Sequence, residues 1–237
     1  MIKTKSKLTK KPVKSLGSHK ELFYDRFSNV WDKKINNSET EKRIKVIFNE
    51  FLSSKDLKGK KFLEVGCGLG YFSNKAFTMG ANVTGIDIGP NLVAINKKKT
   101  PKGQFKVASA SKLPFKDNQF DVVLSTEVIE HVDKQNQALG EMARVLKKGG
   151  MLVITTPNRI FKPLFDFLSI TKIRPYQGNE NWIYSWDMLK FFESKGLVLE
   201  KERYFNFIMP NDFLDRFERI FLFKHLTINY GFRFRKK

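Results

Sequence analysis

Three glycines and an acidic residue surround the end of an apolar run in the segment Phe62–Gly70, which reads Phe-Leu-Glu-Val-Gly-Cys-Gly-Leu-Gly. A strand that ends in a glycine-rich turn lets a ligand approach bare backbone at the carboxyl edge of a parallel sheet. The spacing Gly66-x-Gly68-x-Gly70 departs from the G-x-G-x-x-G of dinucleotide-binding folds, because position 71 is Tyr. Two interpretations remain at this point: a cofactor-binding turn, or an ordinary tight connection between a strand and a helix.

A second chemical signal is Asp87, which ends the next predicted strand 21 positions after Gly66. A carboxylate at this distance from the glycines can accept two hydrogen bonds from the vicinal hydroxyls of a ribose. The alternative is a solvated Asp at the end of a strand.

A third group of polar residues follows the apolar run of Phe120–Ser125. Here His131, one of only three histidines, is expected after a strand at the carboxyl edge of the sheet, where it is a candidate general base. His131 and its neighbour Glu130 can equally serve to fix the loop by hydrogen bonds. The one cysteine, Cys67, excludes an intramolecular disulfide and a cysteine cluster for zinc, and we expect no metal.

The elements that must position these residues alternate between short apolar runs and helical patterns. This alternation predicts an α/β fold, a Rossmann-like doubly wound sheet of seven mostly parallel strands with helices on both faces. Helices are predicted from Ser38 to Leu52, Tyr71 to Met79, Gly89 onward, Lys134 to Leu146, and from a cap at Ser185 to Gly196. The predicted strands are 62–65, 82–87, 104–108, 120–125, 151–155, 197–204 and 228–234.

The rhythm of strands and helices breaks after residue 157. Residues 21–237 are predicted to form a single domain, preceded by a disordered basic arm at 1–20. Residues 157–185 contain an apolar aromatic run interrupted by Pro163, and we expect them to form a lid or acceptor segment. A further helical spacing runs from Phe213 to Phe221.

The formal net charge of +20 is concentrated at the two ends of the chain. Residues 1–20 hold seven Lys and no acid, and four more cations lie at Arg233, Arg235, Lys236 and Lys237. Such tails fit attraction to an anionic membrane surface or to nucleic acid, or they are merely solvated. No nucleic-acid recognition motif accompanies them, so we expect no nucleic-acid partner.

The cellular location follows from what the sequence contains and lacks. A chain with 41% hydrophobic residues is globular, yet no apolar run reaches the roughly 18 residues of a membrane span. The N-terminus lacks the apolar core of a signal peptide. We therefore expect a cytoplasmic protein, with peripheral contact at the inner membrane surface as an open alternative. The oligomeric state is not indicated.

Taken in order, four segments resemble the small-molecule branch of the class I S-adenosylmethionine (SAM) methyltransferases, and most of all the O-methyltransferases of ubiquinone biosynthesis. These segments are Phe62–Gly70, Val83–Gly89, Phe120–Val132 and Leu146–Arg159. The resemblance covers about residues 40 to 160. Beyond it, only Trp182–Ser185 before a predicted helix is similar to this branch.

The resemblance implies SAM as cofactor and a role for each matching residue. The glycine turn would expose backbone to the methionyl part, Glu64 would lie near its ammonium group, and Arg43 near its carboxylate. Asp87 would hold the ribose, and Ile88 would contact the adenine. Where many relatives have an Asp for the adenine amino group, this chain has Ser109, a weaker neutral acceptor, followed by Ala110. The implied cofactor-binding set is Arg43, Glu64, Gly66, Cys67, Gly68, Gly70, Asp87, Ile88, Ser109, Ala110, Thr126 and Glu127.

The sequence thus favours an enzyme that methylates an oxygen, in preference to nitrogen or carbon, of a small or lipid-like acceptor, with an aromatic acceptor as one option. Two alternatives stay open: an RNA-directed methyltransferase that uses the basic tails, and a SAM-binding interaction protein without turnover. The Asn/Asp-Pro-Pro-Tyr signature of N-methyltransferases is absent, since the corresponding segment reads Thr156-Pro-Asn-Arg159. An NAD oxidoreductase is disfavoured by Tyr71.

Overall fold

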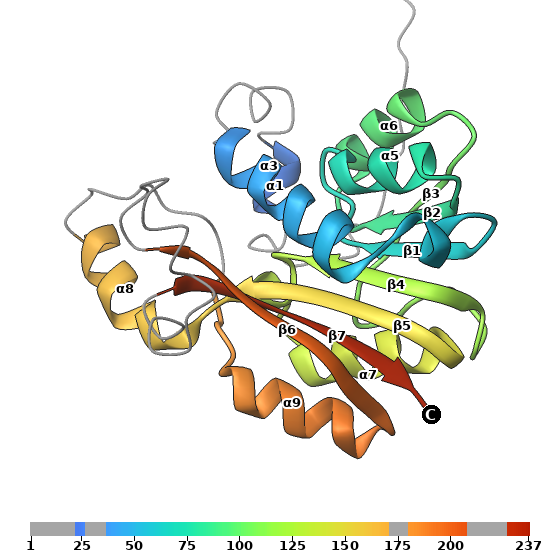
Figure 1. Cartoon of the computed structure of the whole chain (residues 1–237). Helices are drawn as coiled ribbons and strands as arrows, with labels where there is room; N and C mark the ends of the chain where they lie inside the picture. Colours follow the sequence, from blue (N-terminus) through green and yellow to red (C-terminus); the bar gives the residue numbers. More distant parts are fainter. Residues whose placement is uncertain (1–21, 27–36, 171–179, 208–226) are drawn as a thin grey trace, which may run out of the picture.

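A computed structural model describes residues 22–26, 37–170, 180–207 and 227–237. The predicted basic arm and the helical spacing of Phe213–Phe221 lie outside these ranges. One seven-stranded sheet in the order β3-β2-β1-β4-β5-β7-β6 organises the described chain (Figure 1). Its strands are β1 (Lys61–Val65), β2 (Asn82–Asp87), β3 (Gln104–Val107), β4 (Phe120–Thr126), β5 (Leu146–Pro157), β6 (Leu197–Phe207) and β7 (Thr227–Lys236).

The predicted fold class is confirmed by the strand directions. The first five strands pair in parallel, and β7 runs antiparallel to both of its neighbours, β5 and β6. β1 is buried over nearly its whole length because, as a central strand of a parallel sheet, it is covered on both faces.

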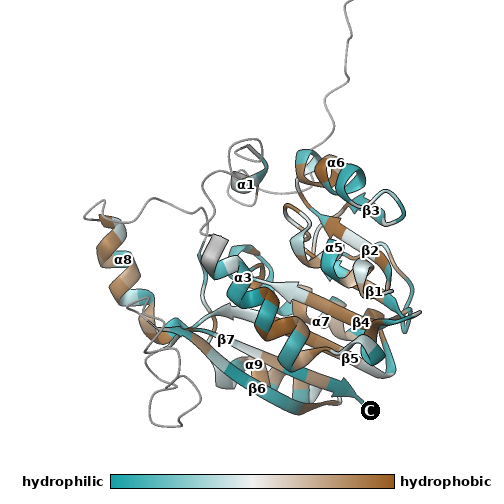
Figure 2. Cartoon of the chain, turned by 45° about the horizontal axis from the view of Figure 1, so that its top comes forward, coloured by the Kyte–Doolittle hydropathy of each residue, from teal (hydrophilic) through white to brown (hydrophobic). Residues whose placement is uncertain are grey.

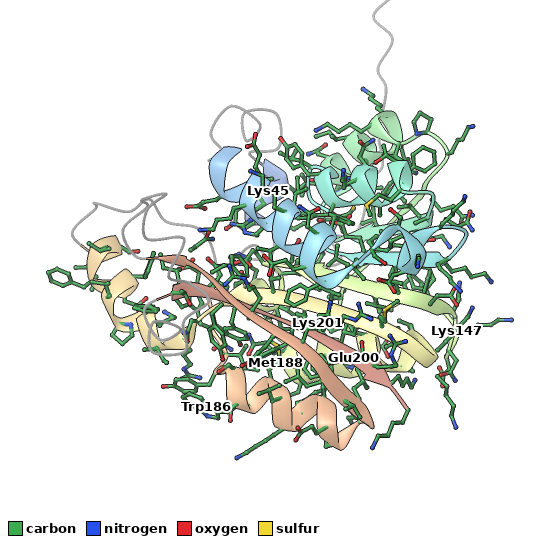
Figure 3. The ribbon with its side chains drawn as sticks, viewed as in Figure 1. Lys45, Lys147, Trp186, Met188, Glu200 and Lys201 are labelled. Atoms are coloured by element: carbon green, nitrogen blue, oxygen red, sulfur yellow. The ribbon has the colours of Figure 1, made fainter. Side chains whose placement is uncertain are left out.

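Helices cover both faces of the sheet, with α3, α5 and α6 on one side and α7 and α9 on the other (Figure 1). The apolar side of α9 faces the sheet: Met188 is fully buried, whereas Trp186 of the same helix is 46% exposed (Figure 3). The helices are α1 (Phe23–Arg26), α3 (Asn37–Lys45), α4 (Ser54–Leu57), α5 (Tyr71–Thr78), α6 (Pro90–Lys99), α7 (Gln135–Val145), α8 (Lys162–Ile170) and α9 (Ser185–Ser194).

The strand order brings the candidate residues to the carboxyl ends of neighbouring strands. The chain runs outward from β1 to β2 and β3, and then returns to β4 on the other side of β1. Connections that leave neighbouring strands in opposite directions open a crevice at the carboxyl ends of those strands, where ligands bind in open α/β sheets. The glycine turn after β1 and the Thr126–His131 segment after β4 flank this position.

Two predicted details of the elements were wrong. Ser185 is the first residue of α9 and not its cap, since Tyr184 occupies the cap position and makes no capping hydrogen bond through its side chain. Pro163, within the apolar run of the sequence, lies in the first turn of α8, where its missing N–H has no helical partner to lose. β5 begins at Leu146 and not at Met151, with Leu146 paired to Phe120.

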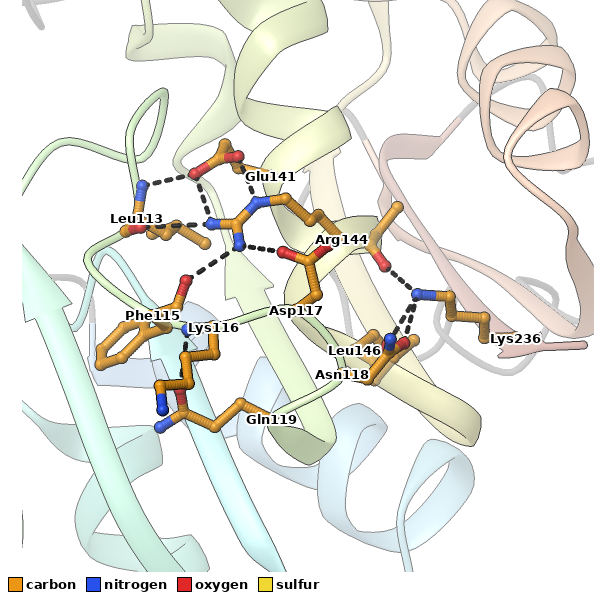
Figure 4. A network of polar contacts seen from close by, with 11 residues as sticks. Leu113, Phe115, Lys116, Asp117, Asn118, Gln119, Glu141, Arg144, Leu146 and Lys236 are labelled. Carbon is orange, nitrogen blue, oxygen red and sulfur yellow. Dashed lines mark hydrogen bonds and ion pairs between the residues drawn. The ribbon is translucent and has the colours of Figure 1, made fainter.

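The C-terminal cations are not a tail, which corrects the charge assignment made from the sequence. Arg233 and Arg235 lie on β7 and both form ion pairs with Glu200 of β6. The ammonium group of Lys236 donates to the carbonyl oxygens of Ala143 and Leu146 at 2.8 and 2.7 Å, at the C-terminal end of α7 (Figure 4). These charges stabilise the sheet edge and a helix terminus.

An arginine-centred network fixes the connection between β3 and β4. The Arg144 guanidinium donates to the carboxylates of Glu141 at 2.6 Å and Asp117 at 2.7 Å, and to the Phe115 carbonyl oxygen at 2.9 Å (Figure 4). Glu141 in turn accepts the backbone N–H of Leu113 at 2.7 Å, and hydrogen bonding to Arg144 lowers the pKa of the Glu141 carboxyl. The network therefore holds the loop that begins at the end of β3.

In the part of the chain that the structure describes, no helix combines the length and the apolar character needed to cross a membrane.

Candidate active site

The glycine turn after β1 adopts a backbone that only glycine takes readily. Gly66, Gly68 and Gly70 all have positive φ angles, of 76°, 45° and 82°. A Cβ on Gly66 would lie 2.3 Å from Val128, and one on Gly70 would lie 2.4 Å from the side-chain oxygen of Asn96. A Cβ on Gly68 would meet nothing within 4 Å. Packing thus requires the outer two glycines, whereas the middle one borders open space that a ligand can occupy.

Asp87 ties this turn to the start of α6. Its Oδ2 accepts the N–H of Gly68 and its Oδ1 accepts the N–H of Gly89, both at 2.9 Å. Burial of this side chain at the end of β2 raises the pKa of Asp87 to about 6. Each carboxylate oxygen can accept more than one hydrogen bond, so the group keeps capacity for ligand hydroxyls.

Glu64 lies beneath the turn on β1 and is almost completely buried. The hydroxyl of Ser73 donates to its Oε2, while its Oε1 has no hydrogen-bond partner among the described residues. Burial raises the pKa of this carboxyl to about 8. A buried oxygen without a donor is uncommon in folded proteins and fits a site that receives its donor from a ligand.

The raised pKa of Glu64 predicts a pH-dependent stability difference. The folded protein holds the Glu64 proton more tightly than the unfolded chain, so stability is highest below the usual carboxyl pKa and falls as the pH rises through about 8. We expect Glu64→Gln, measured without cofactor at pH 8.5, to be more stable than wild type by roughly 2–4 kcal/mol.

Urea unfolding at two pH values checks this expectation. The advantage of Glu64→Gln should shrink at about pH 5, where both side chains are neutral in the folded state. An equal difference at both pH values would contradict the ionisation of a buried Glu64.

The end of β4 brings two predicted residues together with Arg43. Glu127 accepts the Thr155 hydroxyl at 2.8 Å and the Asn229 amide at 2.7 Å. Arg43 of α3 approaches the same carboxylate, with its Nε 4.0 Å from Oε1, and Thr126 is buried one residue earlier. Burial raises the pKa of Glu127, and the Arg43 charge opposes that rise. Glu127 also has a φ of 52°, a conformation that costs a non-glycine residue energy and is common at functional sites.

His131 lies beyond this turn, between a carboxyl group and a phenol. Its Nε2 is 3.9 Å from Oε1 of Glu130 and 3.3 Å from the Tyr24 hydroxyl oxygen. Glu130 is buried and accepts the Thr156 hydroxyl at 3.0 Å. Burial, reinforced by the nearby Glu127 charge, raises the pKa of Glu130 well above its usual value.

The remaining predicted residues occupy neighbouring strand ends. Ile88 directly follows Asp87 and is half-buried, and Ala110 is buried after β3. The Ser109 hydroxyl oxygen lies 3.1 Å from that of Ser111. Cys67 is buried within the turn, where burial raises the pKa of its thiol and disfavours the reactive thiolate.

Three supporting residues were missed from the sequence. Asn96 donates to the Gly68 carbonyl oxygen at 2.7 Å, Ser73 binds Glu64, and Asp25 accepts N–H groups at the start of α6. Asn96 left a signal, because it shares the buried face of its helix with Leu92, four residues earlier. Asp25 left none, since its contacts span 66 positions.

Comparisons with known proteins agree with this geometry. Residues 63–154 match the family model described as Methyltransferase domain. The chain is 32% identical over 143 residues to a probable S-adenosylmethionine-dependent methyltransferase of Mycolicibacterium smegmatis, covering 60% of this chain and 53% of the relative. It is 38% identical over 114 residues to a ubiquinone biosynthesis O-methyltransferase of Pelagibacter ubique, covering 46% and 47%. The chain therefore spans about half the length of these curated relatives.

A solved structure supports the fold independently of sequence identity. The S-adenosylmethionine dependent methyltransferase of Mesorhizobium loti superposes with a TM-score of 0.62 at 17% identity, covering 76% of this chain and 93% of that one. Residues 63–154 are thus similar to methyltransferase domains, and the fold matches that of a SAM-dependent methyltransferase.

Proposed function

We propose that the protein transfers a methyl group from SAM to an oxygen atom of a small or lipid-like acceptor with an apolar or aromatic body. The observation that carries the proposal is the Asp87 carboxylate, bound to the N–H of Gly68 beside the open space above that glycine. A carboxylate that can bind a ribose and a glycine turn beside open space then lie together where the strand order reverses, which is the usual ligand position in such sheets.

The residues present fit SAM. Asp87 would accept the ribose hydroxyls, the unpartnered oxygen of Glu64 would accept from the ammonium group, and Arg43 would attract the carboxylate. Ile88, Ser109 and Ala110 would border the adenine, and Thr126 and Glu127 the methionyl side. SAM supplies a methyl group already activated on a sulfonium. The protein's own task is to orient the acceptor, exclude water and receive a proton.

The acceptor side of the proposal depends on residues 157–185. The ring of Phe165 on α8 lies 5.3 Å from that of Trp182, and the N–H of Asn181 donates to the Glu130 carbonyl oxygen at 2.7 Å. This contact joins the segment to the turn that carries His131. An aromatic ring pair in a segment joined to the turn of the candidate base suits an apolar or aromatic acceptor.

The outer surface of α8 supports peripheral contact with an anionic membrane as the source of a lipid-like acceptor. α8 is predominantly hydrophobic in Figure 2, and its Leu164, Phe167 and Ile170 are exposed. Co-sedimentation with vesicles of anionic and of neutral lipid tests this contact, and equal absence from both pellets would contradict it.

His131 is the proposed proton acceptor. We expect His131→Ala to lower turnover by about 10²–10⁴-fold while changing SAM affinity less than about threefold, because general-base catalysis contributes to chemistry and not to cofactor binding. Steady-state turnover and calorimetry on the same samples give the two quantities. Unchanged turnover would assign His131 a purely structural role.

Two measurements test the proposed function. Calorimetry should show SAM binding to the wild-type chain, and incubation with a panel of phenols, lipids and RNA should release S-adenosylhomocysteine with a hydroxyl-bearing acceptor. Absence of SAM binding would overturn the assignment. Binding with no product from any acceptor would favour a non-catalytic SAM-binding protein. Product from RNA alone would favour the RNA-directed alternative, which has lost the support of the C-terminal cations.

A further inference from the structure

The short helix α1, far from the site in sequence, contacts both halves of the crevice. Asp25 reaches the ribose-side loop before α6, and Tyr24, one residue earlier, reaches His131 on the β4 side. We propose that α1 is part of the active site, with Tyr24 as a positioning residue for the His131 imidazole and Asp25 as its anchor. The role rests on the proposed function, in which His131 receives the acceptor proton.

The anchor is an unusual helix cap. α6 begins after Gly89, which has no side chain to bind the free N–H groups of the first turn. Asp25 supplies that acceptor: its Oδ1 takes the N–H of Asn91 at 2.8 Å and of Leu92 at 3.1 Å, and its Oδ2 takes the Asn91 amide at 3.1 Å. Asp25 is buried, and a carboxylate is favoured at a helix N-terminus. The start of α6 thus fixes α1.

A glycine leaves room for this anchor. A Cβ on Gly89 would lie 2.5 Å from Oδ1 of Asp25, although the φ of −86° at Gly89 is open to any residue. Alanine at position 89 would therefore act on Asp25 by contact and without backbone strain.

With α1 fixed, Tyr24 meets His131 in a defined geometry. The two rings pack edge to face at a centroid distance of 5.0 Å, with the hydroxyl oxygen 3.3 Å from Nε2. A phenol is a better donor and an imidazole nitrogen a better acceptor, so the hydroxyl donates to Nε2 and the ring proton resides on Nδ1. Tyr24 thereby sets the neutral tautomer of His131, in which the lone pair that can receive a proton lies on Nε2.

Long-range ¹H–¹⁵N NMR of the histidine rings at about pH 8, without cofactor, tests the proposal. Neutral imidazole is observed above its usual pKa. The chain has three histidines, and His131→Asn identifies the signals of position 131. In wild type we expect the two ring nitrogens of His131 to resonate far apart, with Nε2 unprotonated. Tyr24→Phe should make them converge as the two tautomers exchange.

Two glycine variants separate the anchor from the contact. Gly89→Ala should reproduce the convergence without touching His131, whereas Gly140→Ala on α7, where the nearest atom to a new Cβ is 4.0 Å away, should leave the signals unchanged. Wild-type signals in Tyr24→Phe would overturn the positioning role, and wild-type signals in Gly89→Ala would overturn the anchor. Since neither SAM nor turnover enters the measurement, its outcome is independent of whether the proposed function holds.

Discussion

Asp87→Ala is expected to weaken SAM binding by at least about 100-fold. In the proposed complex the carboxylate accepts two ribose hydroxyls, and each hydrogen bond to a charged group contributes roughly 1.5–3 kcal/mol. The substitution also frees the N–H groups of Gly68 and Gly89, so the turn loses its tie to α6. Both effects reduce affinity in the same direction, and isothermal calorimetry measures their sum.

Asp121→Ala is a matched control for this variant. Asp121 is also on a central strand, but it binds Lys147 at 2.7 Å and the N–H of Lys61 at the opposite end of the sheet. We expect its SAM affinity to remain within about twofold of wild type. Equal affinities for Asp87→Ala and the control would remove Asp87 from the cofactor site.

The raised pKa of Asp87 adds a pH dependence to cofactor binding. Below about pH 6 the carboxyl group is protonated and loses acceptor capacity, so wild-type affinity should fall as the pH drops through this value, approaching tenfold per unit. Asp87→Asn, neutral at every pH, should bind weakly and without this decline between pH 7 and 5. Calorimetry in the Glu64→Gln background removes the contribution of the buried carboxyl that titrates near pH 8. A pH-independent wild-type affinity would contradict the assignment.

The local parts of the site could be predicted from the sequence because each has a periodic or compositional signal. The strand that ends in Gly66 and the acid that ends the next strand follow from apolar runs and spacing, and the parallel sheet then brings them to one edge. Arg43 was assigned to the cofactor site from a weaker resemblance, and its Nε lies 4.0 Å from Oε1 of Glu127.

Long-range partners could not be predicted, since their choice depends on tertiary packing. Asn229 reaches Glu127 across 102 positions, and Asp25 reaches α6 across 66. The C-terminal cations were assigned to a basic tail for the same reason. Their sequence alone, a run of Arg and Lys beside aromatic residues, does not show that β7 lies between β5 and β6, where Arg233 forms an ion pair with Glu200. Charge in a sequence indicates a partner only after intramolecular partners are known.

Alanine at two glycines of the same turn should separate the folding role of the turn from its binding role. Gly66→Ala combines a φ of 76° with a Cβ only 2.3 Å from Val128, so both backbone strain and overpacking oppose it. We expect a loss of roughly 2–5 kcal/mol in the free energy of unfolding. The φ of Gly68 is 45° and its Cβ would enter open space, so the expected loss is only about 1–2 kcal/mol.

For SAM affinity, the two variants should not follow the order expected for their stability. A methyl group on Gly68 occupies the space through which the proposed ligand approaches the backbone, so Gly68→Ala should lose binding out of proportion to its small loss of stability. Urea unfolding and SAM calorimetry on both variants, with Gly140→Ala as the reference for a glycine outside the turn, provide the comparison. If Gly68→Ala binds SAM as wild type does, the open face of the turn is not the cofactor cradle. If Gly66→Ala is as stable as Gly68→Ala, the contact with Val128 does not determine the shape of the turn.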